Sequence, residues 1–187
     1  QMFGKYDIDG NYRPDNMEWL ERWDHVAKYS WTIPAPETLE FVAQHADGGL
    51  VDPLAGTGYW AYLLGQMGVD VVCYDIEPGT NHWHEGEELW VPVTAMDGAA
   101  AAALHPDRTM LLAWPPYSTD DGYRTLMAYR GNKVIYAGEH DGCTGDSALA
   151  EALEEDWTPI AAHRPVQWFG LHDVLAVYER RTPCQRR

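Results

Sequence analysis

An acid, two glycines and the start of an apolar helix follow one another in the segment from Leu50 to Leu64, which reads LVDPLAGTGYWAYLL. Gly56 and Gly58 let the backbone approach a ligand without a clash from a Cβ atom. The helix that begins near Tyr59 offers N–H groups without intrahelical partners at its first turn. This pattern predicts a ligand-binding turn between a strand and a helix.

A second acid lies about twenty residues downstream of this turn, at a spacing typical of nucleotide-binding folds. Asp75 ends the short apolar segment Val69-Asp-Val-Val-Cys-Tyr-Asp75. At this position a carboxylate can receive the two hydroxyl groups of a ribose. Dinucleotide enzymes share the pattern, so it does not identify the ligand alone.

A rigid aromatic turn, Trp114-Pro-Pro-Tyr117, follows an apolar strand that begins at Thr109. Two prolines fix φ and remove two N–H donors, so the turn cannot extend the sheet and holds its neighbours in place. Trp114 offers an indole N–H and a π face, which can stack on a flat substrate or face a sulfonium. The alternative is that Trp114 packs beneath the sheet. Most of the nine tryptophans, Trp31 and Trp60 among them, are expected in the core.

Two further groups could take part in chemistry. Glu139 follows the apolar segment Val134-Ile-Tyr-Ala-Gly, and its carboxylate could accept a proton or orient a nucleophile. A salt bridge within a loop is an equal alternative. The segment Asn81-His-Trp-His84 suits a substrate-facing loop better than a metal site, because its imidazoles lack a recognisable ligand geometry. We expect no metal.

With these motifs the chain resembles the class I S-adenosylmethionine-dependent methyltransferases over residues 29 to 179. The glycine turn resembles their motif I, Asp75 the acid of motif II, and the Trp-Pro-Pro-Tyr turn stands where many members carry Asp/Asn-Pro-Pro-aromatic. Tyr29-Ser-Trp-Thr-Ile-Pro34 and Tyr136-Ala-Gly-Glu139 narrow the resemblance to a little-characterised group. It implies S-adenosylmethionine as the cofactor, bound by Asp52, Ala55, Gly56, Thr57, Gly58, Asp75, Ile76 and Asp97. It implies a catalytic set of Trp114, Pro115, Pro116, Tyr117 and Glu139.

The resemblance leaves the methyl acceptor open. Asp97 resembles a contact for the adenine amino group and is equally a helix N-cap, two roles that can coexist. Asp52-Pro-Leu-Ala-Gly56 is close to the Asp-Pro-Phe-x-Gly form of amino-methylating nucleic-acid enzymes, and Leu54 replaces the usual first glycine. Trp114, however, cannot accept a hydrogen bond from a target amine. A non-catalytic protein that binds the cofactor, or an acidic interaction protein, is a further alternative.

Composition favours a small-molecule or peptide acceptor. The chain has 187 residues and a formal net charge of −16, from 29 acids against 13 bases, which opposes binding to nucleic acid. Neither a membrane-spanning run nor a signal-peptide h-region occurs, so no membrane partner is expected. Three widely spaced cysteines fit neither a disulfide framework nor a zinc ribbon. These features favour the cytoplasm.

The elements that position these residues alternate along the chain. Two helices, over 15–28 and 36–45, follow an irregular arm over 1–14. Strands are predicted over 49–53, 70–75, 90–94, 109–114, 132–137, 158–163 and 172–179, and helices over 58–67, 97–104, 120–129 and 147–155. This order predicts an α/β fold: a doubly wound, mostly parallel Rossmann-like sheet with an antiparallel last strand and an N-terminal helical extension. We expect one methyltransferase domain over 1–187, comprising the arm and helices to 48, the core over 49–179 and a basic tail over 180–187.

Overall fold

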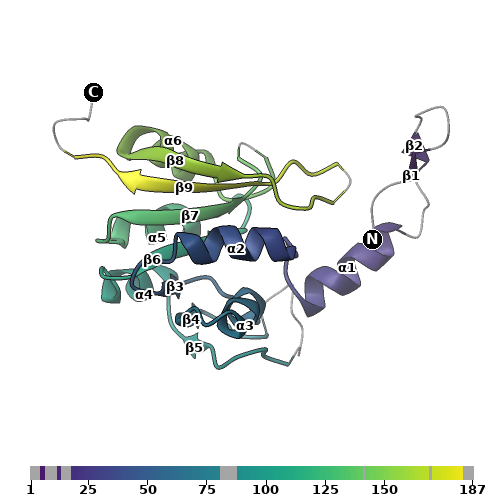
Figure 1. Ribbon diagram of the computed structural model, residues 1–187, viewed down its shortest axis with the longest axis horizontal. Helices are drawn as coiled ribbons and strands as arrows, with labels where there is room; N and C mark the ends of the chain where they lie inside the picture. The colour runs from purple at the N-terminus through teal and green to yellow at the C-terminus, as the bar shows by residue number, and fades with distance from the viewer. Residues whose placement is uncertain are drawn as a thin grey trace.

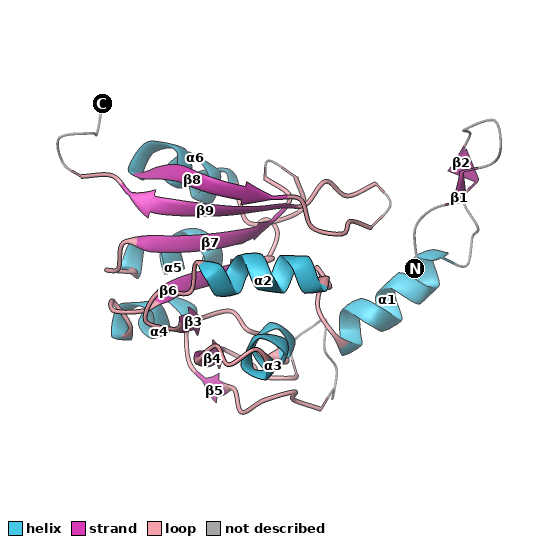
Figure 2. Cartoon of the chain, viewed as in Figure 1, coloured by secondary structure: helices cyan, strands magenta, loops and turns pink. Residues whose placement is uncertain are grey.

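A seven-stranded sheet runs through the centre of the molecule, with helices on both of its faces (Figure 1, Figure 2). The computed structural model describes residues 5–6, 12–13, 18–80, 88–140, 142–168 and 170–182. Among these residues, no helix has the length and apolar character needed to cross a bilayer.

The sheet has the strand order β5-β4-β3-β6-β7-β9-β8. The strands are β3 (Leu50–Asp52), β4 (Val71–Asp75), β5 (Thr94–Ala95), β6 (Thr109–Ala113), β7 (Lys133–Gly138), β8 (Trp157–His163) and β9 (Val174–Arg180). The first five are parallel, whereas β9 is antiparallel to both of its neighbours, β7 and β8. Strand order reverses between β3 and β6, which creates the switch point where folds of this kind bind ligands.

In the described ranges, six helices accompany the sheet: α1 (Glu18–Lys28), α2 (Pro36–Gln44), α3 (Tyr59–Gln66), α4 (Gly98–Leu104), α5 (Asp121–Ala128) and α6 (Ser147–Asp156). The carboxylates of Asp97 and Asp146 accept hydrogen bonds from backbone N–H groups in the first turns of α4 and α6. Pro36 begins α2, where its missing N–H would have no intrahelical partner. The sequence thus specifies the starts of three helices locally.

Alternating side chains on the central strands build two cores. Met110 and Leu112 of β6 pack with helices α4, α5 and α6 on one face of the sheet. Leu111 packs with α2 and α3 on the other face. All three side chains are fully buried, as expected for a parallel strand covered on both faces.

The predicted mostly parallel sheet, its antiparallel last strand and the N-terminal helical extension are confirmed. Two element predictions were wrong. The strand expected over 90–94 is only Thr94–Ala95, because the Trp90 N–H groups bind the carbonyls of Thr57 and Lys28. The arm over 1–14 contains a two-stranded antiparallel ladder, β1 (Lys5–Tyr6) with β2 (Tyr12–Arg13), in which the tyrosines have high strand propensity.

Candidate functional site

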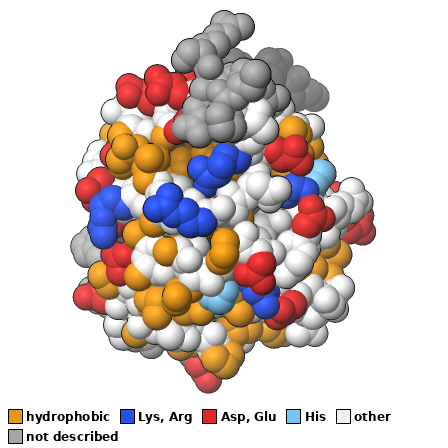
Figure 3. Space-filling view, turned by 90° about the vertical axis from the view of Figure 1, so that its left-hand side faces the viewer, with side chains coloured by type: hydrophobic (Ala, Val, Ile, Leu, Met, Phe, Trp, Pro, Cys, Tyr) orange, Lys and Arg blue, Asp and Glu red, His pale blue; other side chains and the backbone are white. Residues whose placement is uncertain are grey.

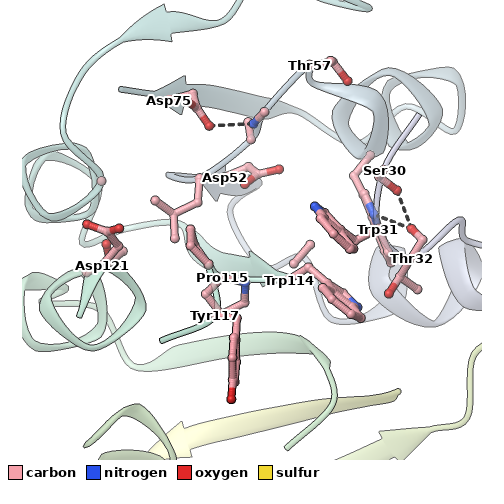
Figure 4. A pocket seen from close by; sticks show the side chains of 18 of the residues that line it. Ser30, Trp31, Thr32, Asp52, Thr57, Asp75, Trp114, Pro115, Tyr117 and Asp121 are labelled. Carbon is pink, nitrogen blue, oxygen red and sulfur yellow. Dashed lines mark hydrogen bonds between the residues drawn. The ribbon is translucent and has the colours of Figure 1, made fainter. Parts of the chain in front are cut away.

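A cavity of about 510 Å³ opens at the carboxyl ends of β3, β4 and β6, where the strand order reverses (Figure 4). Its size falls within the range of small-molecule sites, roughly 300–1,000 Å³. The glycine turn, the ends of β4 and β5, the Trp114-Pro-Pro-Tyr117 turn and the linker between α1 and α2 all contribute to its wall. The topology therefore brings the separate sequence motifs together around one space.

Asp75 is fastened to the glycine turn. Its Oδ2 accepts a hydrogen bond from the N–H of Gly56 at 2.8 Å (Figure 4). Its Oδ1 accepts one from the N–H of Glu77 at 3.0 Å. Gly58 has a φ of 79°, and a Cβ there would lie 2.6 Å from a methyl of Val91. The turn thus requires glycine and holds the carboxylate at the edge of the cavity.

Asp52 is the most unusual polar group in this wall. It is 2% exposed, and its Oδ1 is buried without a hydrogen-bond partner in the described part of the chain. Burial raises the pKa of Asp52 to about 7, and the negative charge of Asp75 adds to this increase. A hydrogen bond from the backbone of Leu54 lowers the pKa and offsets part of it. A buried acceptor without a partner costs free energy, so it marks a position where a ligand donor would be stabilising.

Asp97 and Ile76 lie on the adjoining part of the wall. Asp97 accepts a hydrogen bond from Ala100 at 3.1 Å and pairs with Arg124 at 3.0 Å. The bond from Ala100 is the main reason that the pKa of Asp97 is lowered. The predicted N-cap role is therefore confirmed, and the same residue lines the cavity. Ile76 is 68% exposed, an open apolar side chain at the rim.

Ala55 and Thr57 complete the turn. Ala55 lines the cavity, and its N–H donates to the Tyr74 carbonyl at 2.9 Å. The hydroxyl of Thr57 donates to the carbonyl of Tyr29 at 3.2 Å. Thr57 therefore attaches the linker between α1 and α2 to the glycine turn.

Trp114 forms part of the opposite wall. It has a φ of 52°, which is unusual for a residue with a side chain. Its ring stacks on Trp31, with centroids 4.9 Å apart and planes 7° apart, and Figure 4 shows the two indoles side by side. The Trp114 Nε1–H donates to Oδ2 of Asp173 at 3.2 Å. The indole is half-buried and lines the cavity, and its donor is already in use.

The remaining residues of the proline turn differ in burial. Pro115 is buried and packs close to Gly122, and its carbonyl accepts a hydrogen bond from Gly145 at 2.9 Å. Pro116 and Tyr117 also line the cavity, and Tyr117 is 64% exposed. In Figure 4 its ring points away from Asp52. Tyr117 therefore belongs to the rim.

Glu139 lies outside the cavity lining of the described residues. Its Oε1 accepts hydrogen bonds from the N–H and Nδ1 of His172 at 3.0 and 3.1 Å, and its Oε2 accepts one from the N–H of Cys143 at 3.1 Å. Burial favours a higher pKa for Glu139, but the bonds from Cys143 and His172 keep it below the usual range. These contacts suit a carboxylate that joins two loops better than a proton acceptor.

The sequence is not matched by any model of a known protein family, nor by any curated protein. Solved structures do match. A 1,6-didemethyltoxoflavin-N1-methyltransferase of Burkholderia thailandensis, solved with S-adenosylhomocysteine, matches over 91% of each chain with a TM-score of 0.53 and 18% identity. Magnesium protoporphyrin IX methyltransferase of Synechocystis matches over 93% of this chain and 88% of its own, with a TM-score of 0.57 and 12% identity.

A rRNA methylase of Streptococcus thermophilus matches over 80% of this chain and 99% of its own, with a TM-score of 0.52 and 14% identity. The chain has the fold of the class I S-adenosylmethionine-dependent methyltransferases. At such identities the likeness establishes the methyltransferase fold and leaves the acceptor unspecified.

Sequence reasoning missed a group of residues behind and beside Trp114. Asp173 is fully buried, and its Oδ2 accepts hydrogen bonds from Thr32 at 2.6 Å and from Trp114. Its Oδ1 is buried without a hydrogen-bond partner in the described residues, and burial raises its pKa. Trp31, expected in the core, and Arg22 line the cavity. A signal for Trp31 was present in the motif Tyr29-Ser-Trp-Thr-Ile-Pro34, whereas nothing local marks Asp173.

The segment Asn81-His-Trp-His84 lies outside the described residues. Within the described ranges, no group of three or more His, Cys, Asp or Glu side chains is arranged to hold a metal ion.

Proposed function

We propose that this protein is an S-adenosylmethionine-dependent methyltransferase that acts on a small-molecule or peptide acceptor. The observation that carries this proposal is the pair of acids at the switch point of the sheet. Asp75 is fastened to the glycine turn, and Asp52 next to it keeps a buried oxygen without a described partner. The cofactor would occupy the end of the cavity lined by these acids, and the acceptor the end lined by Trp31 and Trp114.

The residues at the acidic end fit the parts of S-adenosylmethionine. Each Asp75 oxygen accepts one described hydrogen bond and keeps a lone pair for a ribose hydroxyl. Asp97 can accept from the adenine amino group, and the exposed Ile76 can cover the adenine ring. The Oδ1 of Asp52 can accept from the cofactor's α-ammonium group, which would supply the missing partner and stabilise the ionised carboxylate.

The chemistry requires little of the protein beyond alignment. When bound, the cofactor would supply a methyl group on a sulfonium for transfer to a lone pair of the acceptor. The chain contributes a rigid turn that fixes Trp114 next to the reacting centre and apolar walls that exclude water. Orientation of this kind can account for several kcal/mol of a barrier, on the order of 7–11 kcal/mol in well-aligned model systems.

The nucleic-acid alternative is weakened by the site. The side chain of Trp114 has an N–H donor, which is bound to Asp173, and no oxygen that could accept a hydrogen bond from an exocyclic amine. The net charge of −16 opposes a long phosphate backbone.

Calorimetric titration with S-adenosylhomocysteine tests the proposal. We expect binding by the wild type and a loss of about tenfold to a hundredfold in affinity for Asp75→Ala, since a charge-assisted contact is worth about 1.5–3 kcal/mol. Asp70→Ala is the matched control, because Asp70 precedes the same strand at its other end and binds Arg108. No heat with the wild type would refute the proposed function, and equal affinity of both variants would remove Asp75 from the site.

A further inference from the structure

Charge is unevenly distributed around the cavity. The acidic side chains that line it, among them Asp52, Asp75 and Asp97, follow the ends of β3, β4 and β5 or begin α5. At the end lined by Trp31 and Trp114, the charged side chain among the described lining residues is Arg22. Arg124, the other cation in the described lining, lies at the acidic end and pairs there with Asp97 at 3.0 Å. Acids outnumber bases at that end, so the two ends suit ligand groups of opposite charge.

The Trp31 and Trp114 indoles stack on each other, and neighbouring residues hold the pair in place. The Trp31 and Trp114 rings are parallel within 7°. The Trp60 Nε1–H donates to the Thr32 carbonyl at 3.0 Å, and both Thr32 and Trp114 donate to the Asp173 carboxylate. These contacts fix the two stacked rings before a ligand arrives. A flat ring that adds to the stack therefore requires little further ordering of protein side chains.

Arg22 places a cation beside this pair of rings. It is 8% exposed, and its Cζ lies 5.3 Å from the ring centroid of Trp31 and 5.8 Å from that of Trp168. A guanidinium has five N–H donors in one plane, a geometry that matches the oxygens of an oxyanion. Burial lowers the pKa of Arg22, while the nearby Asp173 supports its charge.

Among the described residues, the acceptor end offers no strong base. The described residues that line the cavity include no histidine or lysine, and the carboxylates among them lie at the cofactor end. The Cys143 thiol lines the acceptor end, and its hydrogen bond to Glu139 raises its pKa. The described lining residues therefore favour an acceptor atom that already carries a free lone pair at neutral pH and needs no base to expose it.

We propose that the methyl acceptor is a planar aromatic anion, with its ring stacked on the Trp31–Trp114 wall and its anionic group directed at Arg22. This inference rests on the proposed function. A lone pair of the acceptor atom forms the bond to the methyl carbon while the carbon–sulfur bond breaks and its electron pair stays on sulfur. The products are the methylated acceptor and S-adenosylhomocysteine, and no proton has to be removed.

Binding of four probes to the protein saturated with S-adenosylhomocysteine tests this inference, read by calorimetry and by indole fluorescence. The probes are 2-naphthoate, neutral 2-naphthamide, the cation 2-naphthylmethylammonium and the non-planar anion decahydro-2-naphthoate. We expect 2-naphthoate to bind at least tenfold more tightly than each of the others. Arg22→Met should remove that advantage and leave 2-naphthamide affinity within twofold, whereas Trp31→Leu should weaken both planar probes. The exposed Arg130→Met is the matched control and should change nothing.

Saturation with S-adenosylhomocysteine is measured first and separates the two ways of failing. An absence of S-adenosylhomocysteine binding would count against the proposed function. Normal binding combined with equal affinities for all four probes, or with tightest binding of the cation, would overturn the planar anion and leave the cofactor site intact. If circular dichroism shows Arg22→Met unfolded, Arg22→Lys keeps the charge without the planar fork. The affinity of Arg22→Lys should then fall more for 2-naphthoate than for 2-naphthamide, and equal decreases in affinity would overturn the inference.

Discussion

The two ends of the parallel strands differ in how their polar groups are satisfied. At the amino ends, Arg108 pairs with Asp70 at 2.6 Å and Lys133 pairs with Asp47. Arg180 donates from Nε and Nη2 to backbone carbonyls at 2.9 and 2.7 Å. Figure 3, which faces this end of the sheet, shows basic side chains interleaved with acidic ones. The charged groups at this end therefore pair with one another or with the backbone and stabilise the fold.

At the carboxyl ends the pattern is reversed. Asp52 and Asp173 each keep a buried oxygen without a hydrogen-bond partner in the described residues. Trp114 and Ser118 have positive φ values of 52° and 55°. Such groups cost stability and persist where the surrounding structure supports them, which is typical of ligand-binding ends of folds. The comparison indicates that the polar contacts at the amino ends stabilise the fold, whereas the groups at the carboxyl ends lower its stability.

The largest expected effect on stability comes from the amino end. Arg180→Ala removes two hydrogen bonds from a charged group and a guanidinium 4.2 Å from the ring centroid of Trp157. We expect the free energy of unfolding in urea to fall by about 2–3 kcal/mol. Affinity for S-adenosylhomocysteine in calorimetry should stay within twofold. A large loss of affinity for S-adenosylhomocysteine in a folded variant would contradict the statement that the amino ends serve stability and the carboxyl ends serve binding.

Asp52→Asn should act in the opposite direction. Because the folded protein raises the pKa of Asp52 to about 7, it binds a proton that the unfolded chain has released, and stability falls as pH rises from about 4 to 7. Above pH 7 the buried charge remains uncompensated in the unliganded protein. We expect the variant to gain on the order of 2 kcal/mol at pH 8 in urea unfolding. A loss of stability at that pH would show that Asp52 is paired in the folded protein.

Trp114→Phe should have a smaller effect on stability and a specific effect on turnover. The change keeps a ring for stacking and removes the 3.2 Å hydrogen bond to Asp173, worth about 1 kcal/mol. We expect methyl transfer to slow several-fold while S-adenosylhomocysteine affinity is unchanged, because the acceptor wall loses its fixed position. Trp90→Phe is the control, since it removes a comparable indole bond to the Lys28 carbonyl outside the cavity lining. Equal slowing of both variants would contradict this role of Trp114.

The smallest effect should come from Asp47→Ala. The Asp47 side chain is 73% exposed although its partner Lys133 is largely covered. Exposed ion pairs contribute about 0–1 kcal/mol, and we expect a decrease of about 0.5 kcal/mol in the free energy of unfolding that shrinks with added salt. A decrease of several kcal/mol in urea unfolding would show that this surface pair is a main support of the sheet.

The sequence was informative where a local pattern determines the structure. Gly56, Gly58 and Asp75 lie on one strand–turn–helix unit and the strand that follows it, so their meeting could be predicted from spacing. The N-cap role of Asp97 is equally local. Nothing in the segment Leu171-His-Asp173 distinguishes its acid, because its partners Thr32 and Trp114 are 141 and 59 residues away.

The acceptor end could not be predicted for the same reason. Trp31 and Trp114 are brought together by the packing of the α1–α2 linker against the end of β6, and their spacing in the sequence gives no sign of it. Glu139 followed a buried strand as expected, but its oxygens turn to Cys143 and His172. A position at the end of a strand predicts the edge of the sheet and does not predict the direction of the side chain.

Proton exchange on ligand binding tests the central claim, that the carboxyl end is held ready for a cofactor. S-adenosylhomocysteine is titrated into the protein at pH 7 in two buffers of different ionisation enthalpy, for the wild type and for Asp52→Asn. Burial raises the pKa of Asp52 to about 7, and the ligand's ammonium group should favour the ionised carboxylate. We therefore expect the wild type to release roughly half a proton and to bind more weakly as pH falls. The variant should release none and bind more weakly than the wild type at pH 8. Equal proton exchange and equal affinity in the two proteins would contradict the account.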